Sequence, residues 1–337
     1  MAHEHSKTES GARAVFRPQL GVQKAEPAMS VSAPADWTQR QERGSRLAMT
    51  LMRWLSLRLG RVLSRAILPF IALYFLIAAP AVRRASRDYL TRALGRPASW
   101  LDVLRHLHTF AATVHDRVYL LNDRLDLFDI TIEGQDVVDR ALAAGRGAVL
   151  VGAHFGSFEV LRAATRSTAA EGRRYDATMV MYEDNARRIN ATLAALNPQV
   201  KPRIIALGRP DAMMLVQQAL DENRLVGFLA DRTLTAQPTL SVPFLGEAAP
   251  FPLGAFRLAA VLRQQVVLMQ GIYLGGRRYH VRFASIADFS NGAAGERDAA
   301  VCDAVRAYAH ALDEGCRAHP YNWFNFFDFW HEQPGPG

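Results

Sequence analysis

Cysteine and lysine are scarce in this 337-residue chain. Cys302 and Cys316 are the only cysteines, which excludes a disulfide scaffold and a four-cysteine zinc site and favours a reducing compartment. Lysine is confined to Lys7, Lys24 and Lys201, so arginine carries nearly all of the positive charge. With 50% apolar and 21% charged residues, the composition excludes a disordered or fibrous protein. The net charge of +8 predicts an anionic partner.

Long apolar runs are also missing. The longest uncharged segment, Ala66–Val82, has 17 residues, at the lower limit for a spanning helix, and it contains two prolines. Several arginines precede and follow this segment in the chain, and the only acidic residue between Arg43 and Arg96 is Asp88. Positive charge on both sides departs from the one-sided distribution of a simple span. The segment either spans once, enters one leaflet, or is a buried core helix. We favour membrane attachment and leave its geometry open.

The chain is expected to have four parts. Residues 1–40 show no sustained apolar period and predict a disordered leader. Residues 41–127 predict a basic region of hydrophobic and amphipathic helices that anchors the protein to a membrane. Residues 128–330 predict an α/β domain, and residues 331–337 a flexible tail.

The α/β prediction rests on short apolar runs that alternate with helical patterns. The candidate strands are Asp129–Ile132, Ala148–Ala153, Ala177–Met181, Arg203–Ala206, Leu225–Ala230, Val266–Tyr273 and a hairpin partner at Tyr279–Phe283. The candidate helices are Gln135–Ala144, Ser157–Thr168, Ala186–Leu196, Asp211–Glu222, Leu253–Arg263 and Arg297–Ala318. This alternation predicts a mostly parallel central sheet flanked by helices.

The strongest candidate site follows the apolar strand Ala148–Ala153. Ligands of open parallel sheets bind beyond the carboxyl ends of the strands, and His154 stands in the turn after this one. Ser157 is a good N-cap for the next helix, which puts Glu159 in the first turn, where a carboxylate is favoured. The turn lets His154 and Glu159 meet, so the pair is predicted to be a general base with its orienting carboxylate. A capped turn with a surface histidine is the structural alternative.

Four stretches of the chain, in order, carry a resemblance to known proteins. They are the His-x4-Glu block in GAVLVGAHFGSFEVLRA, the strand LVGFLADRT that ends in an aspartate, the proline-glycine block VPFLGEAAPFPLGAFRLA and the aromatic stretch HPYNWFNFFDFW. Together they resemble the lipid A biosynthesis (late) acyltransferase family, within the lysophospholipid acyltransferase-like superfamily. The amino-acid sequences of the last two blocks are most similar to those of acyltransferases of aryl polyene pigment pathways.

The resemblance implies an enzyme of the bacterial inner membrane, with its catalytic domain on the cytoplasmic side. It would move a fatty acyl chain from an acyl carrier protein or coenzyme A thioester to a hydroxyl. The acceptor would be a membrane glycolipid, such as a lipid A precursor, or an aryl polyene. The expected partners are therefore acyl carrier protein and membrane lipids, and no nucleic acid. A catalytically inactive membrane lipid-binding protein is the alternative from another class.

The resemblance also implies roles for single residues. His154 would deprotonate the acceptor hydroxyl while Glu159 holds the other ring N–H. The turn amides around Gly156 and Ser157, or an arginine, would bind the oxyanion. No metal and no cofactor beyond the acyl donor are expected, and the sequence contains no Gly-x-Ser-x-Gly elbow for an acyl-enzyme.

Charged residues at two other strand ends complete the candidate site as predicted substrate-binding residues, with Asp231 and Arg232 at one end and Arg209 at the other. Arg232 either contacts phosphopantetheine or an acceptor phosphate, or pairs with Asp231 to close the strand end. Arg209, at another strand-to-helix turn, is a weaker candidate of the same kind. Family members typically carry Asp-Gln where this chain has Asp231 and Arg232, and Thr-Pro where it has Phe251 and Pro252. These departures leave the acceptor open.

The remaining clusters are given structural roles. His106, His108 and His115 lack a carboxylate or cysteine at ligand spacing and are expected to be solvated. The two cysteines fall on one face of the last helix and are expected to pack in the core. The aromatic stretch near the C-terminus is expected to pack in the core or at a membrane interface.

Overall fold

The computed structural model of the protein describes residues 60–161, 175–182, 203–232, 237–291 and 294–330, together with Trp54 and Arg58. All of these residues lie in one compact unit, Arg43–Gly337. The predicted leader, the predicted flexible tail, the predicted helix Ala186–Leu196 and most of the predicted helix Ser157–Thr168 lie outside the described residues.

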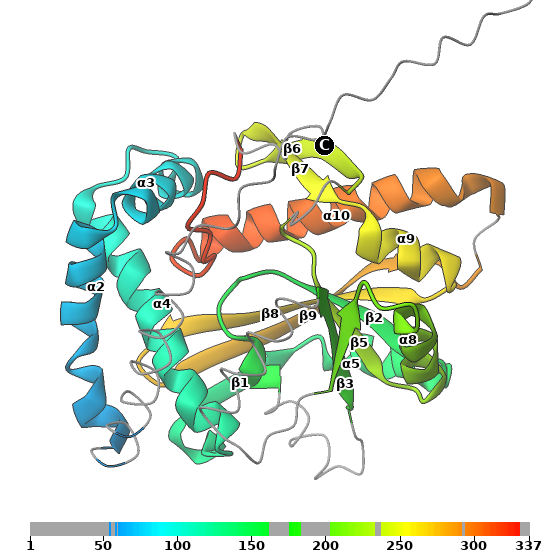
Figure 1. Cartoon of the computed structure of the whole chain (residues 1–337), viewed down its shortest axis with the longest axis horizontal. Coiled ribbons are helices and arrows are strands. Elements are labelled where there is room, and N and C mark those ends of the chain that lie inside the picture. The colour runs from blue at the N-terminus through cyan, green and yellow to red at the C-terminus, as the bar shows by residue number, and fades with distance from the viewer. Residues whose placement is uncertain are drawn as a thin grey trace, which may run out of the picture. The chain divides into compact units, whose positions relative to one another are not determined.

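A central sheet organises the described part of the chain (Figure 1). In spatial order its strands are β1 (Asp129–Glu133), β9 (Arg278–Asp288), β8 (Gln265–Gly275), β2 (Ala148–Gly152), β5 (Leu225–Leu229), β3 (Ala177–Tyr182) and β4 (Ile204–Leu207). The five strands from β8 to β4 pair in parallel, β9 runs antiparallel to β8, and β1 pairs in parallel with β9. The mostly parallel sheet predicted from the sequence is therefore confirmed.

Helices cover both faces of this sheet. The alternating residues of β2 show it, because Ala148 and Leu150 belong to the hydrophobic core that includes Val138 of α5 (Gln135–Ala143). Val149 and Val151 belong to the core of the other face, which α8 (Ala212–Asp221), α9 (Gly254–Val261) and α10 (Arg297–Ala318) help to form. The helix α4 (Trp100–Leu121) contributes to both cores. A strand that is buried on both faces explains the unbroken apolar run before His154.

One hairpin was not predicted from the sequence. The strands β6 (Thr239–Phe244) and β7 (Glu247–Pro252) pair with each other and pack against α10. Their three prolines conceal the strand pattern, because proline lacks the N–H of a sheet ladder and is tolerated only at edges. Phe244 and Phe251 are buried, so this proline-glycine block contributes to the core.

The apolar N-terminal segment forms a helix that is packed on one side and exposed on the other. Gly60–Ala78 is the one stretch in the described chain that is long and apolar enough to cross a membrane, and 22% of its most apolar window is buried. Within it, Leu68, Ala72 and Leu76 of α2 (Leu68–Ala78) are buried, and α2 packs against α4. Large apolar side chains on the rest of α2 are exposed, which argues against a buried core helix. The chain bends at Ala79 and continues as α3 (Pro80–Leu94).

Candidate active site

The turn after β2 is held from two sides. Phe155 forms a β-bridge with Trp323, and Gly156 forms one with Gly271 of β8. Gly156 has a φ angle of +64°, and a Cβ at this position would lie 1.9 Å from the carbonyl oxygen of Gly271. Glycine alone fits such a conformation at such a close approach. These contacts fix the backbone beside His154.

His154 is paired with a carboxylate, and that carboxylate belongs to Asp231. The Nδ1 of His154 lies 2.9 Å from Oδ1 of Asp231, and the backbone N–H of His154 donates to Oδ2 at 2.9 Å. The His154 side chain is 35% exposed, whereas that of Asp231 is fully buried. An ionised carboxylate only accepts hydrogen bonds, so Nδ1 carries the ring proton. The lone pair then lies on Nε2, for which the described residues supply no partner.

The surroundings of Asp231 keep its carboxyl group ionised. Burial by itself raises the pKa of Asp231, but the charge and hydrogen bonds of His154, with a smaller contribution from Arg232, outweigh it and lower the pKa well below its usual range. The indole Nε1–H of Trp323 also donates to Oδ2, at 2.9 Å. A fixed buried carboxylate of this kind orients the imidazole and stabilises the imidazolium that forms when Nε2 takes a proton.

The register of the sheet explains this pairing. Gly152 of β2 lies opposite Leu229 of the neighbouring parallel strand β5. Two residues beyond each of them stand His154 and Asp231, so the two side chains leave the same edge of the sheet next to each other. The sequence predicted only that Asp231 binds substrate or pairs with Arg232. Matching the ends of the two apolar strands would have indicated the pair with His154.

The prediction that Glu159 orients His154 is therefore wrong. Glu159 lies in the short 3-10 helix Phe158–Val160, where its Oε1 forms an ion pair with Nε of Arg117 at 2.6 Å. Its Oε2 accepts a hydrogen bond from the Ser157 hydroxyl at 3.0 Å. Glu159 thus ties the turn to α4, and its contribution to the site is indirect.

The turn amides have partners within the protein as well. The N–H of Gly156 donates to the carbonyl oxygen of Asn322 at 2.8 Å, and that of Ser157 donates to the carbonyl oxygen of Gly271 at 2.7 Å. Both amides hold the turn in place, so neither is free to bind an oxyanion as the sequence analysis expected. The Ser157 side chain is buried against Glu159, which gives it a structural role.

Of the two predicted arginines, the structure brings only Arg232 to the site. Its Nη2 donates to the carbonyl oxygen of Phe324 at 2.7 Å, and its guanidinium lies 5.1 Å from the ring centre of Phe327. Burial lowers the pKa of Arg232, and the neighbouring Asp231 partly restores it. Arg209 is exposed, pairs with Asp211, and follows β4 at the edge of the sheet, three strands away from β2.

The sequence of this site is that of a known family. The model of the bacterial lipid A biosynthesis acyltransferases matches residues 109–332, about two-thirds of the chain and all of the site. The chain belongs to the bacterial lipid A biosynthesis acyltransferase family. Two relatives, both named phosphatidylinositol mannoside acyltransferase, come from two strains of Mycobacterium tuberculosis. Each is 27% identical over 201 residues, which is 58% of this chain and 58% of the relative's own length.

In this lipid A acyltransferase family member, the aromatic segment 321–330 organises the site. The N–H of Phe324 donates to the carbonyl oxygen of His154 at 2.8 Å. The side chain of Asn322 bonds both backbone groups of Tyr273 in β8, at 2.8 and 3.1 Å. Together with Trp323 at Asp231, three consecutive residues hold the turn that carries His154. The sequence predicted packing in the core or at a membrane interface; the burial of Trp323 favours the core, and the polar contacts were not predicted.

The histidines of α4 are also placed differently from the prediction. His106 and His115 are buried, not solvated. His106 lies between the hydroxyl of Ser86 and the carbonyl oxygen of Trp323, and burial lowers its pKa to about 4. Within the described ranges, no group of three or more His, Cys, Asp or Glu side chains could hold a metal ion. Cys316 is buried and Cys302 is half-buried, and both are free thiols.

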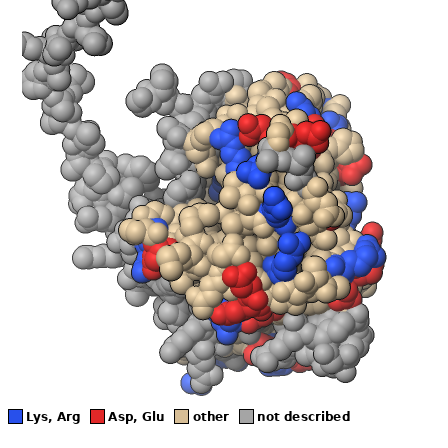
Figure 2. Space-filling model, turned by 90° about the vertical axis from the view of Figure 1, so that its right-hand side faces the viewer, with Lys and Arg blue, Asp and Glu red and all other residues tan. Residues whose placement is uncertain are grey.

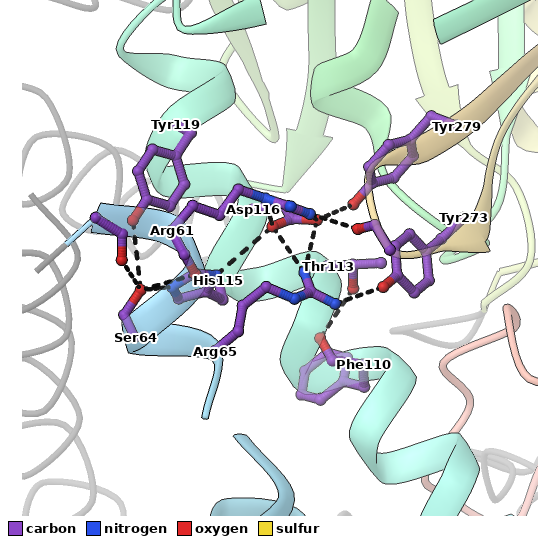
Figure 3. A network of polar contacts seen from close by, with 12 residues as sticks. Arg61, Ser64, Arg65, Phe110, Thr113, His115, Asp116, Tyr119, Tyr273 and Tyr279 are labelled. Atoms are coloured by element: carbon purple, nitrogen blue, oxygen red, sulfur yellow. Dashed lines mark hydrogen bonds and ion pairs between the residues drawn. The ribbon is translucent and has the colours of Figure 1, made fainter. Parts of the chain in front are cut away.

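A buried polar network connects the N-terminal segment to β8 and β9 (Figure 3). Asp116 of α4 is fully buried, and its carboxylate lies 2.9 Å from Nε of Arg61 and 3.0 Å from Nη1 of Arg65. The hydroxyl of Tyr279 donates to the same carboxylate at 3.0 Å, and Nη2 of Arg65 donates to the hydroxyl of Tyr273 at 2.5 Å. The two arginines just before α2 are thus part of the protein core.

On one face of the molecule, positive and negative charges are mixed. On the side of the molecule where α8 and α9 lie in Figure 1, arginines alternate with acidic residues among wide uncharged areas (Figure 2). Local pairs of an arginine with an acidic residue, such as Arg209 with Asp211, occur in the described chain. Pairs of this kind contribute little to the attraction of a distant anionic partner.

Proposed function

We propose that this protein transfers a fatty acyl group from a thioester donor to a hydroxyl of a membrane lipid or glycolipid, with His154 as the general base. The observation that supports this most is the His154–Asp231 pair at the carboxyl edge of the sheet, which leaves Nε2 with an available lone pair. Family membership supports the reaction type. Asp231, and not Glu159, is the orienting carboxylate in this proposal.

The reaction needs one proton relay. Nε2 of His154 takes the proton of the acceptor hydroxyl while the hydroxyl oxygen attacks the thioester carbonyl carbon. The resulting imidazolium is stabilised by Asp231. When the tetrahedral intermediate collapses, the C–S bond breaks and the imidazolium returns the proton to the leaving thiolate. The products are an ester and a free thiol, and no acyl-enzyme forms. A correctly placed base contributes about 10²–10⁴ to the rate.

The donor and the acceptor are proposed at the level of their chemistry. The donor is an acyl thioester of acyl carrier protein or coenzyme A, and no further cofactor takes part. The names of the mycobacterial relatives favour a glycolipid acceptor, and the family name favours a lipid A precursor. An aryl polyene acceptor stays a prediction from the sequence. Mass spectrometry of lipids from a deletion strain would identify the acceptor, because one species loses one acyl group.

We also propose that the protein sits on the cytoplasmic side of a bacterial inner membrane. On α2 the apolar side chains of Phe70, Tyr74 and Ile77 are 72%, 63% and 69% exposed. Exposed arginines follow them on α3, at Arg84 and Arg87. An apolar surface next to cations fits a membrane interface with anionic lipids. Because α2 packs along α4, we propose that it lies in one leaflet and does not span the membrane.

The test of the function is acyl transfer by His154→Ala protein, with acyl carrier protein thioesters and extracted membrane lipids as substrates. The proposal expects a loss of at least 10²-fold in kcat in protein that keeps its native fold by circular dichroism, with a lower thermal midpoint because the buried Asp231 carboxylate loses a hydrogen-bond donor. His310→Ala is the matched control, because His310 is exposed on α10 and pairs only with its helix neighbour Glu314. Wild-type activity in His154→Ala protein would refute the mechanism. Tight lipid binding without any product would favour the inactive lipid-binding protein.

A further inference from the structure

The proposed transfer creates a negative charge that the turn amides do not stabilise. When the hydroxyl attacks the thioester, its carbonyl oxygen becomes an oxyanion, which needs hydrogen-bond donors in a site sheltered from water. The N–H groups of Gly156 and Ser157 already donate to Asn322 and Gly271. These two N–H groups are therefore not available to an oxyanion, and other groups of the site are candidate donors.

Two buried polar groups of the site have no hydrogen-bond partner. The side chain of Asn325 is almost fully buried, at 1% exposure, and neither its Nδ2 nor its Oδ1 has a partner in the described chain. The Nε of Arg232 is likewise buried and without a hydrogen-bond partner among these residues. Protein interiors pair such groups almost without exception, because an unpaired buried donor destabilises the fold. Unpaired groups beside a catalytic base point to a ligand that pairs them.

Both groups adjoin the catalytic pair. The Phe324–Asn325 peptide carbonyl accepts a hydrogen bond from Nη2 of Arg232, at 2.7 Å. The N–H of Phe324 donates to the carbonyl oxygen of His154. Asn325 is the next residue, and consecutive Cα atoms are about 3.8 Å apart. The unpaired amide and the unpaired guanidinium N–H therefore flank the same peptide, one residue away from a direct contact with His154.

We propose that Asn325 is a catalytic residue whose side-chain amide, together with Nε–H of Arg232, donates to the thioester carbonyl oxygen and stabilises the oxyanion. This inference rests on the proposed acyl transfer. The Asn325 amide and the Nε–H of Arg232 differ from the turn amides in that neither has a hydrogen-bond partner in the described chain. The half-buried Phe327 ring lies 5.1 Å from the Arg232 guanidinium.

A substitution of Asn325 by leucine separates catalysis from folding. Leucine has a similar size and removes an amide that no protein group satisfies, so the thermal midpoint of Asn325→Leu protein should stay the same or rise. Loss of one oxyanion donor should lower kcat by about 10²–10³-fold and leave KM for the acyl donor nearly unchanged. Asn325→Asp protein, which keeps the size but loses the N–H donor, should lose kcat to a similar degree.

Gln270 provides the matched control. It is another buried amide, at 1% exposure, whose side-chain atoms lack hydrogen-bond partners in the described chain, but it packs against Gly315 of α10. Gln270→Leu protein should keep wild-type kcat. Wild-type kcat in Asn325→Leu protein overturns the inference, and so does a joint fall of kcat and thermal midpoint, which would give the amide a structural role. If His154→Ala protein is as active as wild type, the proposed function itself fails, whatever Asn325 does.

Discussion

Replacing Asp231 by asparagine tests how the carboxylate controls the imidazole. In the native protein its two oxygens accept three hydrogen bonds, from Nδ1–H of His154, from the backbone N–H of His154 and from Nε1–H of Trp323. Asparagine has one accepting oxygen and one donating NH₂ group. It can therefore satisfy either the Nδ1–H alone or the other two donors together.

The second arrangement is the better one, because it keeps two hydrogen bonds and leaves no two donors facing each other. It directs the NH₂ group at Nδ1 of His154, which must then accept a hydrogen bond. The ring proton moves to Nε2, and the base loses its lone pair at the position where the hydroxyl binds. We expect kcat to fall by about 10³–10⁴-fold, as when a triad aspartate becomes asparagine, which corresponds to about 4–5 kcal/mol.

Two measurements check this reasoning. Steady-state acyl transfer gives the change in kcat, and ¹⁵N chemical shifts of the labelled His154 ring report which nitrogen carries the proton. Asp221→Asn protein is the control, because Asp221 is exposed and accepts a hydrogen bond from Gln217 on the surface of α8. A folded Asp231→Asn protein that loses less than tenfold in kcat, or that keeps the proton on Nδ1, would refute the assigned role.

Three other outcomes are expected. Gly156→Ala should abolish activity and lower the thermal midpoint, because the new Cβ would collide with Gly271. Gly95→Ala, at the same φ of +64° but in open space, should lower the free energy of unfolding by only about 1–2 kcal/mol. Equal effects of the two substitutions would contradict the steric argument. Ile77→Asp should weaken the sedimentation of the protein with anionic vesicles. Met214→Asp, a substitution at a similarly exposed position on α8, should not weaken it. Equal binding by both variants would contradict the proposal that α2 contacts the membrane. Burial raises the pKa of Asp116, but hydrogen bonds with His115 and Arg61 and the charges of Arg65 and Arg61 lower it overall. Its stabilisation is therefore present above about pH 4 and is lost as pH falls. Asp116→Asn should flatten the acid side of the thermal midpoint against pH, and an unchanged slope would contradict this.

The fold was predictable from the sequence where local pattern decides. The strands around Ala148–Ala153 and Leu225–Ala230 were found because both are unbroken apolar runs, and α10 was predicted with the bounds that the structure has. The β6–β7 hairpin was missed because its prolines mask the alternating strand pattern. The two strands form nevertheless, because tertiary packing outweighs the local preference of the sequence. Periodicity predicts helices and strands that have a regular apolar pattern, but it does not reveal which elements pack against each other.

The site was only half predictable for the same reason. His154 was found from its place after a buried strand, but its partner was sought five residues away and lies 77 residues away. The contact depends on the register of two neighbouring strands, which no local spacing encodes. The hydrogen bond from Trp323 to Asp231 was missed because it arises from where the aromatic segment folds back. The burial of His106 and His115 likewise depends on contacts with distant elements.

The network around Asp116 has a practical consequence for sample preparation. Deleting an apolar N-terminal segment is a common way to obtain a soluble sample of a membrane-bound protein. A cut that removes α2 would also remove Arg61 and Arg65 and leave a fully buried carboxylate without these cations, a loss of about 3–5 kcal/mol. Tyr273 would also lose its hydrogen bond to Arg65, and its backbone is held by the same asparagine that supports the catalytic turn. Detergent with the intact chain is therefore the better route to crystals or spectra.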